Sequence, residues 1–160
     1  MKLRVVWFGR RGADPFDREV ETYRSRVHRR WPAEDLPHKP VSGGRDRDPA
    51  RALAAEAEAA RGAVPAGWTL AVLDEHGDTV TSVGLAGWLG DLEDTGVPGV
   101  AFVVGSDLGL DPGLARTADR VVSLGPLTLP HRIARLVLWE QIFRATSILA
   151  GGRYHRLGVQ

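Results

Sequence analysis

The chain has 160 residues and is 43% hydrophobic, so it can bury one core but is short for two, and we expect a single domain over residues 1–160. Its 21 Lys and Arg residues nearly balance 20 Asp and Glu residues, and the net charge of +1 argues against binding nucleic acid through bulk charge alone. The absence of cysteine excludes disulfides and thiolate metal sites.

No membrane or secretory segment is recognisable in the sequence. The N-terminal residues Met1–Gly9 are too short and too charged for a secretory signal, and no apolar stretch approaches the length of a membrane span. We therefore expect a cytoplasmic enzyme or binding domain with no membrane partner and no metal.

A strand and a helix open the chain. Residues 2–8 are rich in β-forming side chains and end in Gly9, which predicts a strand. Asp14 is a plausible N-cap, with Pro15 in the first turn, for a helix that continues to Arg30. Its apolar stripe consists of Phe16, Val20, Tyr23 and Val27. Its basic C-terminal end, which suits the helix dipole, contains Arg24, Arg26, Arg29 and Arg30.

The rest of the chain predicts alternating strands and helices. Residues 31–47 are rich in Pro, Gly and charge, with at most a short strand at 36–41 and a mobile segment at 42–47. The later helices are expected at 48–61, at 82–95, from Asp111 and after Pro130, and the later strands at 68–73, 100–104 and 119–124. This alternation predicts an α/β fold with a mainly parallel sheet and helices on both faces.

Three strand ends define a candidate pocket, at Leu73, Gly105 and Leu124. Ligands of open α/β sheets collect beyond the carboxyl ends of the strands. Gly105 lets a ligand approach the main chain, and residues 124–129 offer backbone groups and leucines to a flat heterocycle. The alternative, about equally favoured, is that residues 124–129 only pack as an apolar connection and Gly105 only turns the chain.

The C-terminal part carries a specific resemblance. The run from Leu127 to Ala145, LTLPHRIARLVLWEQIFRA, followed by Tyr154-His155-Arg156, closely resembles the ribosomal large-subunit pseudouridine N3-methyltransferase family of the SPOUT superfamily. The chain length and the strand ends at Gly9, Asp74 and Gly105 agree with the same family, so the likeness covers nearly the whole chain.

This resemblance implies a fold, a methyl donor and a substrate. The fold is a parallel sheet whose C-terminal segment is threaded into a deep trefoil knot, and the protein is a homodimer. The donor is S-adenosylmethionine, and the substrate is a pseudouridine of 23S rRNA, methylated at N3. We expect the protein to act on this rRNA within the assembled ribosome. The donor-binding positions of the family correspond here to Leu73, Gly105, Leu124, Gly125, Pro126, Leu127, Thr128 and Leu129.

The resemblance also implies catalytic residues in the C-terminal tail, where Tyr154, His155 and Arg156 match the segment that closes over the target base. His155 is a candidate proton acceptor, and Arg144 or Arg156 a candidate for stabilising negative charge on a carbonyl oxygen. The alternatives are a solvated His155 and a salt bridge from Arg144 to Glu140, and the salt bridge is slightly favoured. His131 fits better as a helix-start residue that hydrogen-bonds structure.

Two departures from the family pattern lie near the pocket. The family usually has a second glycine after Gly105 and, shortly afterwards, an acidic residue, whereas this chain has Ser106-Asp107-Leu108. The tail also extends through Leu157–Gln160. These changes are compatible with an alternative in which the fold and the donor are retained but the methyl acceptor differs. That acceptor is either another RNA site or a free nucleoside. A third possibility is a non-catalytic RNA-binding or assembly protein whose affinity comes from Arg24, Arg26, Arg29, Arg30, Arg45 and Arg47.

Overall fold

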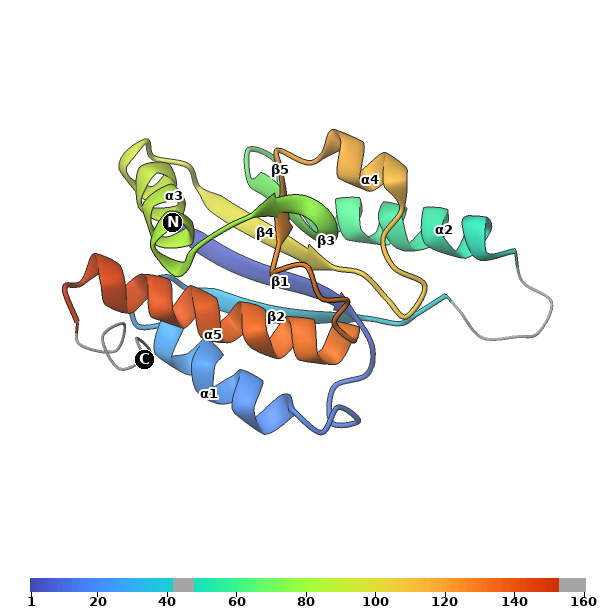
Figure 1. Ribbon diagram of the computed structural model, residues 1–160, viewed down its shortest axis with the longest axis horizontal. Helices are drawn as coiled ribbons and strands as arrows, with labels where there is room; N and C mark the ends of the chain where they lie inside the picture. Colours follow the sequence, from blue (N-terminus) through green and yellow to red (C-terminus); the bar gives the residue numbers. More distant parts are fainter. Residues whose placement is uncertain (42–47, 153–160) are drawn as a thin grey trace.

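The computed structural model describes residues 1–41 and 48–152, in which five parallel strands form one sheet in the order β2-β1-β4-β3-β5 (Figure 1). The strands are β1 (Lys2–Phe8), β2 (Ala33–His38), β3 (Thr69–Thr79), β4 (Gly99–Val104) and β5 (Arg120–Ser123). Because the strands are parallel, their carboxyl ends all lie at the same edge of the sheet.

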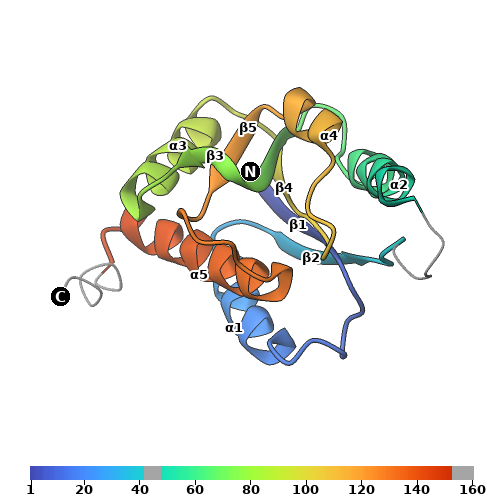
Figure 2. The same cartoon turned by 45° about the vertical axis from the view of Figure 1, so that its right-hand side comes forward.

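Helices cover both faces of the sheet, which confirms the expected α/β architecture. They are α1 (Asp17–Val27), α2 (Pro49–Gly62), α3 (Ser82–Asp94), α4 (Pro112–Thr117) and α5 (His131–Leu149). Helices α1, α3 and α5 pack together on one face, and α2 and α4 lie on the other (Figures 1 and 2). The trefoil knot stays a prediction.

The central strand β4 is buried along its whole length and serves two cores. Successive side chains of a strand face opposite sides of the sheet. Phe102 and Val104 therefore belong to the core under α1, α3 and α5, whereas Val103 belongs to the core under α2 and α4. The continuous apolar run of β4 is what a strand covered on both faces requires.

Asp14 is not the N-cap of α1, so that expectation was wrong. The helix begins at Asp17, and Phe16 occupies the cap position without a side-chain cap. Asp14 instead turns the chain before the helix by accepting a hydrogen bond from the backbone N–H of Phe16 at 2.9 Å. Its other carboxylate oxygen accepts a bond from Arg135, also at 2.9 Å, so Asp14 is used to bind a side chain of α5.

Several element boundaries differ from the expected ones. Helix α1 ends at Val27 rather than at Arg30, because the chain turns there to bury Trp31. Strand β2 begins earlier than expected, pairing Ala33 with Leu3, and ends at His38. Residues 42–47, expected to be mobile, lie outside the described residues.

Strand β3 continues beyond its expected end at Leu73. Its pairing with β5 is irregular between Leu73 and Asp78, and both of these residues have Val122 as partner. The residues between them, 74–77, therefore bulge out of the ladder. The strand expected at 68–73 stops short of these residues, but the register shift keeps them in the strand and directs them to the edge at which the other strands end.

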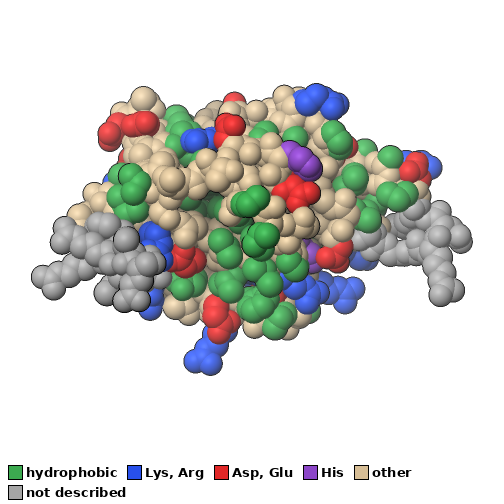
Figure 3. Space-filling model, viewed as in Figure 1, with side chains coloured by type: hydrophobic (Ala, Val, Ile, Leu, Met, Phe, Trp, Pro, Cys, Tyr) green, Lys and Arg blue, Asp and Glu red, His purple; other side chains and the backbone are tan. Residues whose placement is uncertain are grey.

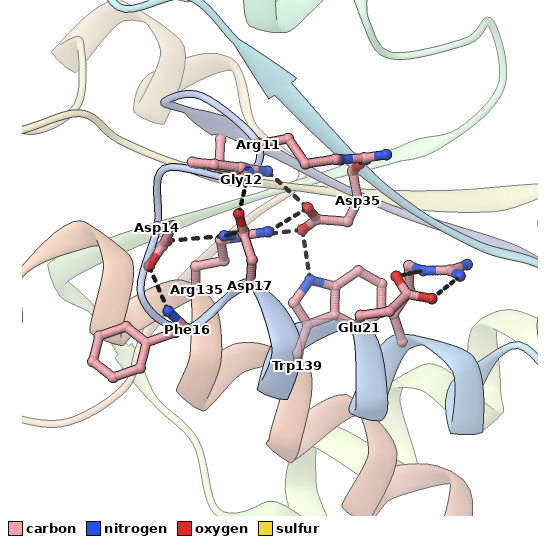
Figure 4. Close-up of polar contacts among 11 residues, drawn as sticks. Arg11, Gly12, Asp14, Phe16, Asp17, Glu21, Asp35, Arg135 and Trp139 are labelled. Atoms are coloured by element: carbon pink, nitrogen blue, oxygen red, sulfur yellow. Dashed lines mark hydrogen bonds and ion pairs between the residues drawn. The ribbon is translucent and has the colours of Figure 1, made fainter.

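One buried guanidinium joins α5 to the first third of the chain (Figure 4). Arg135 donates to both carboxylate oxygens of Asp35, at 3.1 and 2.6 Å, and to Asp14 and Asp17 at 2.9 and 2.8 Å. Its side chain is only 2% exposed. The indole N–H groups of Trp7 and Trp139 also donate to Asp35, at 2.9 and 2.8 Å, so the buried carboxylate is fully used.

The charges of this cluster reinforce one another. Burial by itself would raise the pKa of the Asp17 carboxyl, but bonds from Arg135 and from the backbone N–H of Gly12 outweigh it and hold the pKa below its ordinary value. Burial would likewise lower the pKa of Arg135, and the carboxylates of Asp35 and Asp17 raise it instead. Both groups therefore stay ionised in the folded protein.

We predict that Arg135→Met lowers the free energy of unfolding by about 3–5 kcal/mol, because it leaves buried carboxylates without their cation. Urea denaturation of the two proteins measures the difference. Arg132→Met is the matched control, since Arg132 is exposed on the same helix and no contact of its side chain is described; it should change stability by less than about 0.5 kcal/mol. A loss below about 1 kcal/mol in Arg135→Met would contradict the assignment.

A second prediction concerns the stability of the fold at acidic pH. Because the folded-state pKa of Asp17 is depressed, its contribution to stability is present above the unfolded-state pKa and is lost as the pH falls through the folded-state value. Between about pH 5 and pH 3, the unfolding free energy should therefore fall more steeply in the wild type than in Asp17→Asn. Asp94→Asn, at an exposed position on α3, should keep the wild-type slope. Equal slopes in the wild type and Asp17→Asn would refute the prediction.

Candidate functional site

A cavity of about 350 Å³ lies at the edge of the sheet where β3, β4 and β5 end. Leu73 pairs with Val104 on one side and with Val122 on the other, and all three side chains line the cavity. Hydrophobic side chains gather at the centre of this face of the molecule, with acidic and histidine side chains beside them (Figure 3). The strand ends thus form an apolar floor, and the loops that follow them form the walls.

The structure brings nearly all the donor-site candidates together. Leu73, Gly105, Leu124, Gly125, Leu127, Thr128 and Leu129 line this one cavity. Pro126 belongs to the same loop but is not among the lining residues. A ligand role for these residues stays a prediction, whereas their convergence on one cavity is a property of the fold.

Gly105 is required by the tight loop that follows β4. A Cβ atom at this position would lie 2.3 Å from the carbonyl oxygen of Gly109, closer than real side chains allow. Gly109 itself has φ +90°, a conformation that favours glycine. Ser106 is 7% exposed, and its hydroxyl accepts the backbone N–H of Leu108 at 3.2 Å, so its side chain supports this loop.

Side-chain contacts tie the walls of the cavity together. The hydroxyl of Thr128, in the loop before α5, donates to Glu75 of β3 at 2.5 Å. His131, the first residue of α5, meets Asp107 of the loop after β4, with 2.8 Å between Nδ1 and a carboxylate oxygen. His131 is therefore a helix-start residue that bonds structure, as expected, but it also lines the cavity.

The cavity wall carries more acidic groups than the sequence analysis foresaw. Asp74, Glu75 and His76 line it from the irregular part of β3, and His76 Nδ1 lies 2.9 Å from Asp74. Sequence reasoning missed these residues because it ended the strand at Leu73. The signal available was the run of polar side chains directly after a buried strand, which in a parallel sheet projects beyond its carboxyl edge.

The proposed catalytic residues are not part of the described cavity wall. Arg144 forms a salt bridge with Glu140 at 2.6 Å, the alternative that the sequence favoured, and it does not line the cavity. Tyr154, His155 and Arg156 lie outside the described residues. Their roles stay predictions.

The arginines near the end of α1 are largely engaged within the protein. Arg24 pairs with Glu21 and Arg30 with Glu93, each at 2.5 Å, and Arg26 stacks over Phe143. Arg45 and Arg47 lie outside the described residues. In the described part of this arginine set, Arg24 and Arg30 are thus engaged in ion pairs, whereas Arg26 keeps its charge beside Phe143 and Arg29 is exposed.

The described residues contain neither a cluster of metal ligands nor a helix that could span a membrane. Within residues 1–41 and 48–152 there is no group of three or more His, Asp or Glu side chains that could hold a metal ion. In the same ranges, none of the helices is both long enough and apolar enough to cross a bilayer.

Known proteins similar to this chain agree on one family. A family model described as "Predicted SPOUT methyltransferase" matches residues 1–155. The chain is 41% identical over 159 residues to a protein of Rhodopseudomonas palustris (strain HaA2), and this alignment covers 98% of this chain and 99% of the relative. It is 42% identical over 154 residues to a protein of Solidesulfovibrio magneticus, and this alignment covers 96% of this chain and 97% of the relative. Both relatives carry the name "Ribosomal RNA large subunit methyltransferase H".

We predict that Gly105→Ala lowers the free energy of unfolding, by about 1 kcal/mol or more, because the added methyl group displaces the backbone at Gly109. Gly87→Ala is the control: it lies inside α3 with open space around its Cβ, so it should raise stability by up to about 1 kcal/mol. Denaturant titrations measure both. A neutral Gly105→Ala would show that the loop has room for a side chain.

Proposed function

Since the chain belongs to the SPOUT methyltransferase family, we propose that it transfers a methyl group from S-adenosylmethionine to large-subunit ribosomal RNA. The observation that supports the proposal is the cavity at the ends of β3, β4 and β5, whose lining includes seven of the eight positions that the resemblance implies for the donor. The relatives' names supply the rRNA substrate, and a ribosomal substrate agrees with the expected cytoplasmic location.

The cavity fits an adenosyl group in size and chemistry. Its volume of about 350 Å³ lies within the range typical of small-molecule sites. Leu124, Leu127 and Leu129 supply apolar walls for a flat ring, and the backbone of Gly125, which has φ +133°, bears no side chain that would block its approach. We propose that residues 124–129 enclose the adenine between leucines and backbone groups.

The charges of the wall also suit this donor. S-adenosylmethionine, when bound, supplies a methyl group already activated on a positively charged sulfur. The carboxylates of Asp74 and Glu75 lie on the cavity wall and complement such a positive charge. With the donor activated in this way, the protein has to align the acceptor nitrogen and exclude water from it.

We further propose that the acceptor is N3 of a pseudouridine in 23S rRNA, as the resemblance of the C-terminal segment implies. Tyr154, His155 and Arg156 then close over the target base, with Arg144 or Arg156 near a carbonyl oxygen, in a homodimer that acts on the assembled ribosome. A domain of this size offers little surface for RNA specificity by itself, which favours the ribosome over naked rRNA.

A different acceptor is the second candidate. Asp107 and Leu108 stand where the family pattern has other residues, and Leu108 lines the cavity while 39% exposed. A changed residue at the mouth of the cavity favours a changed acceptor with the same donor.

The donor site is tested by calorimetry. We predict that S-adenosylmethionine binds the wild type and that Ala134→Phe weakens binding about tenfold or more, because the ring enters the cavity from α5. Ala55→Phe, at an exposed position on α2, is the control and should bind as the wild type does. No heat of binding with the wild type would favour a non-catalytic RNA-binding protein.

The acceptor is tested by offering large ribosomal subunits, naked rRNA and free pseudouridine with labelled donor. We expect label to enter the subunits alone, at a pseudouridine N3. Transfer to free nucleoside, or to another position, would replace this acceptor while leaving the donor site in place.

A further inference from the structure

His131 is a histidine of the cavity wall whose orientation is fixed from outside its own helix. Its side chain is 11% exposed, and its Nδ1 lies 2.8 Å from a carboxylate oxygen of Asp107. The two residues come from different segments, His131 from the start of α5 and Asp107 from the loop after β4. The contact holds the imidazole ring, which lines the cavity, against this loop, while the side chain of Asp107 is 84% exposed and does not itself line the cavity.

The carboxylate also selects the tautomer of the ring. A neutral imidazole carries one N–H donor and one acceptor nitrogen, and a carboxylate accepts hydrogen bonds but does not donate them. Asp107 therefore places the proton of neutral His131 on Nδ1 and leaves Nε2 as the acceptor. No partner of Nε2 is found among the described residues.

The other ionisable groups of the wall do not combine these properties. Asp74, Glu75 and His76 face the same cavity from β3, and Arg132 follows His131 on α5 but is exposed. His76 also pairs with a carboxylate, yet its side chain is 85% exposed. A proton acceptor in methyl transfer works best where water is excluded and the ring is fixed, which favours His131, 11% exposed, over His76, 85% exposed.

We propose that His131, oriented by Asp107, is the base that removes the proton from the acceptor nitrogen. The inference rests on the proposed methyl transfer to an imide nitrogen such as N3 of pseudouridine. The N–H proton passes to Nε2 of His131, and the nitrogen's electron pair forms the bond to the methyl carbon. The carbon–sulfur bond breaks with its electrons on sulfur, which becomes a neutral thioether, and the histidinium later returns its proton to water.

Asp107 is the positioning residue of this pair. It keeps Nε2 free of its proton before the reaction, and its negative charge stabilises the histidinium during the reaction. This use of an aspartate and a histidine requires no metal and no additional reactant. It also accounts for the acidic residue at position 107 of this chain, where the family pattern has its acid elsewhere.

Single-turnover methylation of large ribosomal subunits tests the proposal. With saturating donor, His131→Gln should slow transfer by about 100-fold or more, and Asp107→Asn should slow it by a smaller factor. Calorimetry should find the donor bound by both variants.

A measurement without the donor separates catalysis from structure. Nitrogen NMR of labelled imidazoles should find neutral His131 of the wild type protonated at Nδ1, and Asp107→Asn should move the proton toward Nε2. Full activity of His131→Gln would overturn the proposal, as would a loss of activity of that size found in His155→Gln instead. A wild type that neither binds the donor nor methylates RNA would instead refute the proposed function itself.

Discussion

The guanidinium of Arg135 is the contact on which the arrangement of this protein depends. It lies one turn inside α5, buried beneath the side of the sheet formed by β1 and β2, and it is bonded to Asp14, Asp17 and Asp35. Three carboxylates in an apolar interior would repel one another without a cation among them. The cluster therefore specifies which helix packs there and in which register, because displacing α5 by one turn would leave the three carboxylates without their partner.

The same contact bears on the cavity through the start of α5. His131 and Ala134 lie in the turn of α5 that ends at Arg135, and both line the cavity. Residues 124–129 run directly into this turn and are held from the other side by the bond between Thr128 and Glu75. Fixing the helix at Arg135 thus fixes the wall that bears the proposed base and the proposed adenine loop. A preorganised wall of this kind lets a small domain align reacting groups without a large movement.

The sequence predicted the parts of the site that depend on local pattern. Apolar runs ending in Gly105 and Leu124 place strand ends at one edge, and a parallel sheet then requires them to converge. The Arg135 cluster was not predicted, because its partners are distant in the sequence. Asp35 and Asp14 lie 100 or more residues before Arg135 along the chain. The available signal was the position of Arg135, three and four residues before the buried Leu138 and Trp139, which places this charged residue on the buried face of the helix. The wall at 74–76 was missed because a register shift, invisible in the sequence, keeps polar residues inside a strand.

Amide hydrogen exchange of Arg135→Lys beside the wild type tests most directly whether this cluster holds the cavity in place. Lysine keeps the positive charge but cannot bond Asp35 through two nitrogens while also reaching Asp14 and Asp17. Amides of residues 124–134 should exchange faster in the variant, while those of α2 on the opposite face keep their wild-type rates. Unchanged protection of residues 124–134 would show that the cavity wall is held without Arg135 and would contradict the account.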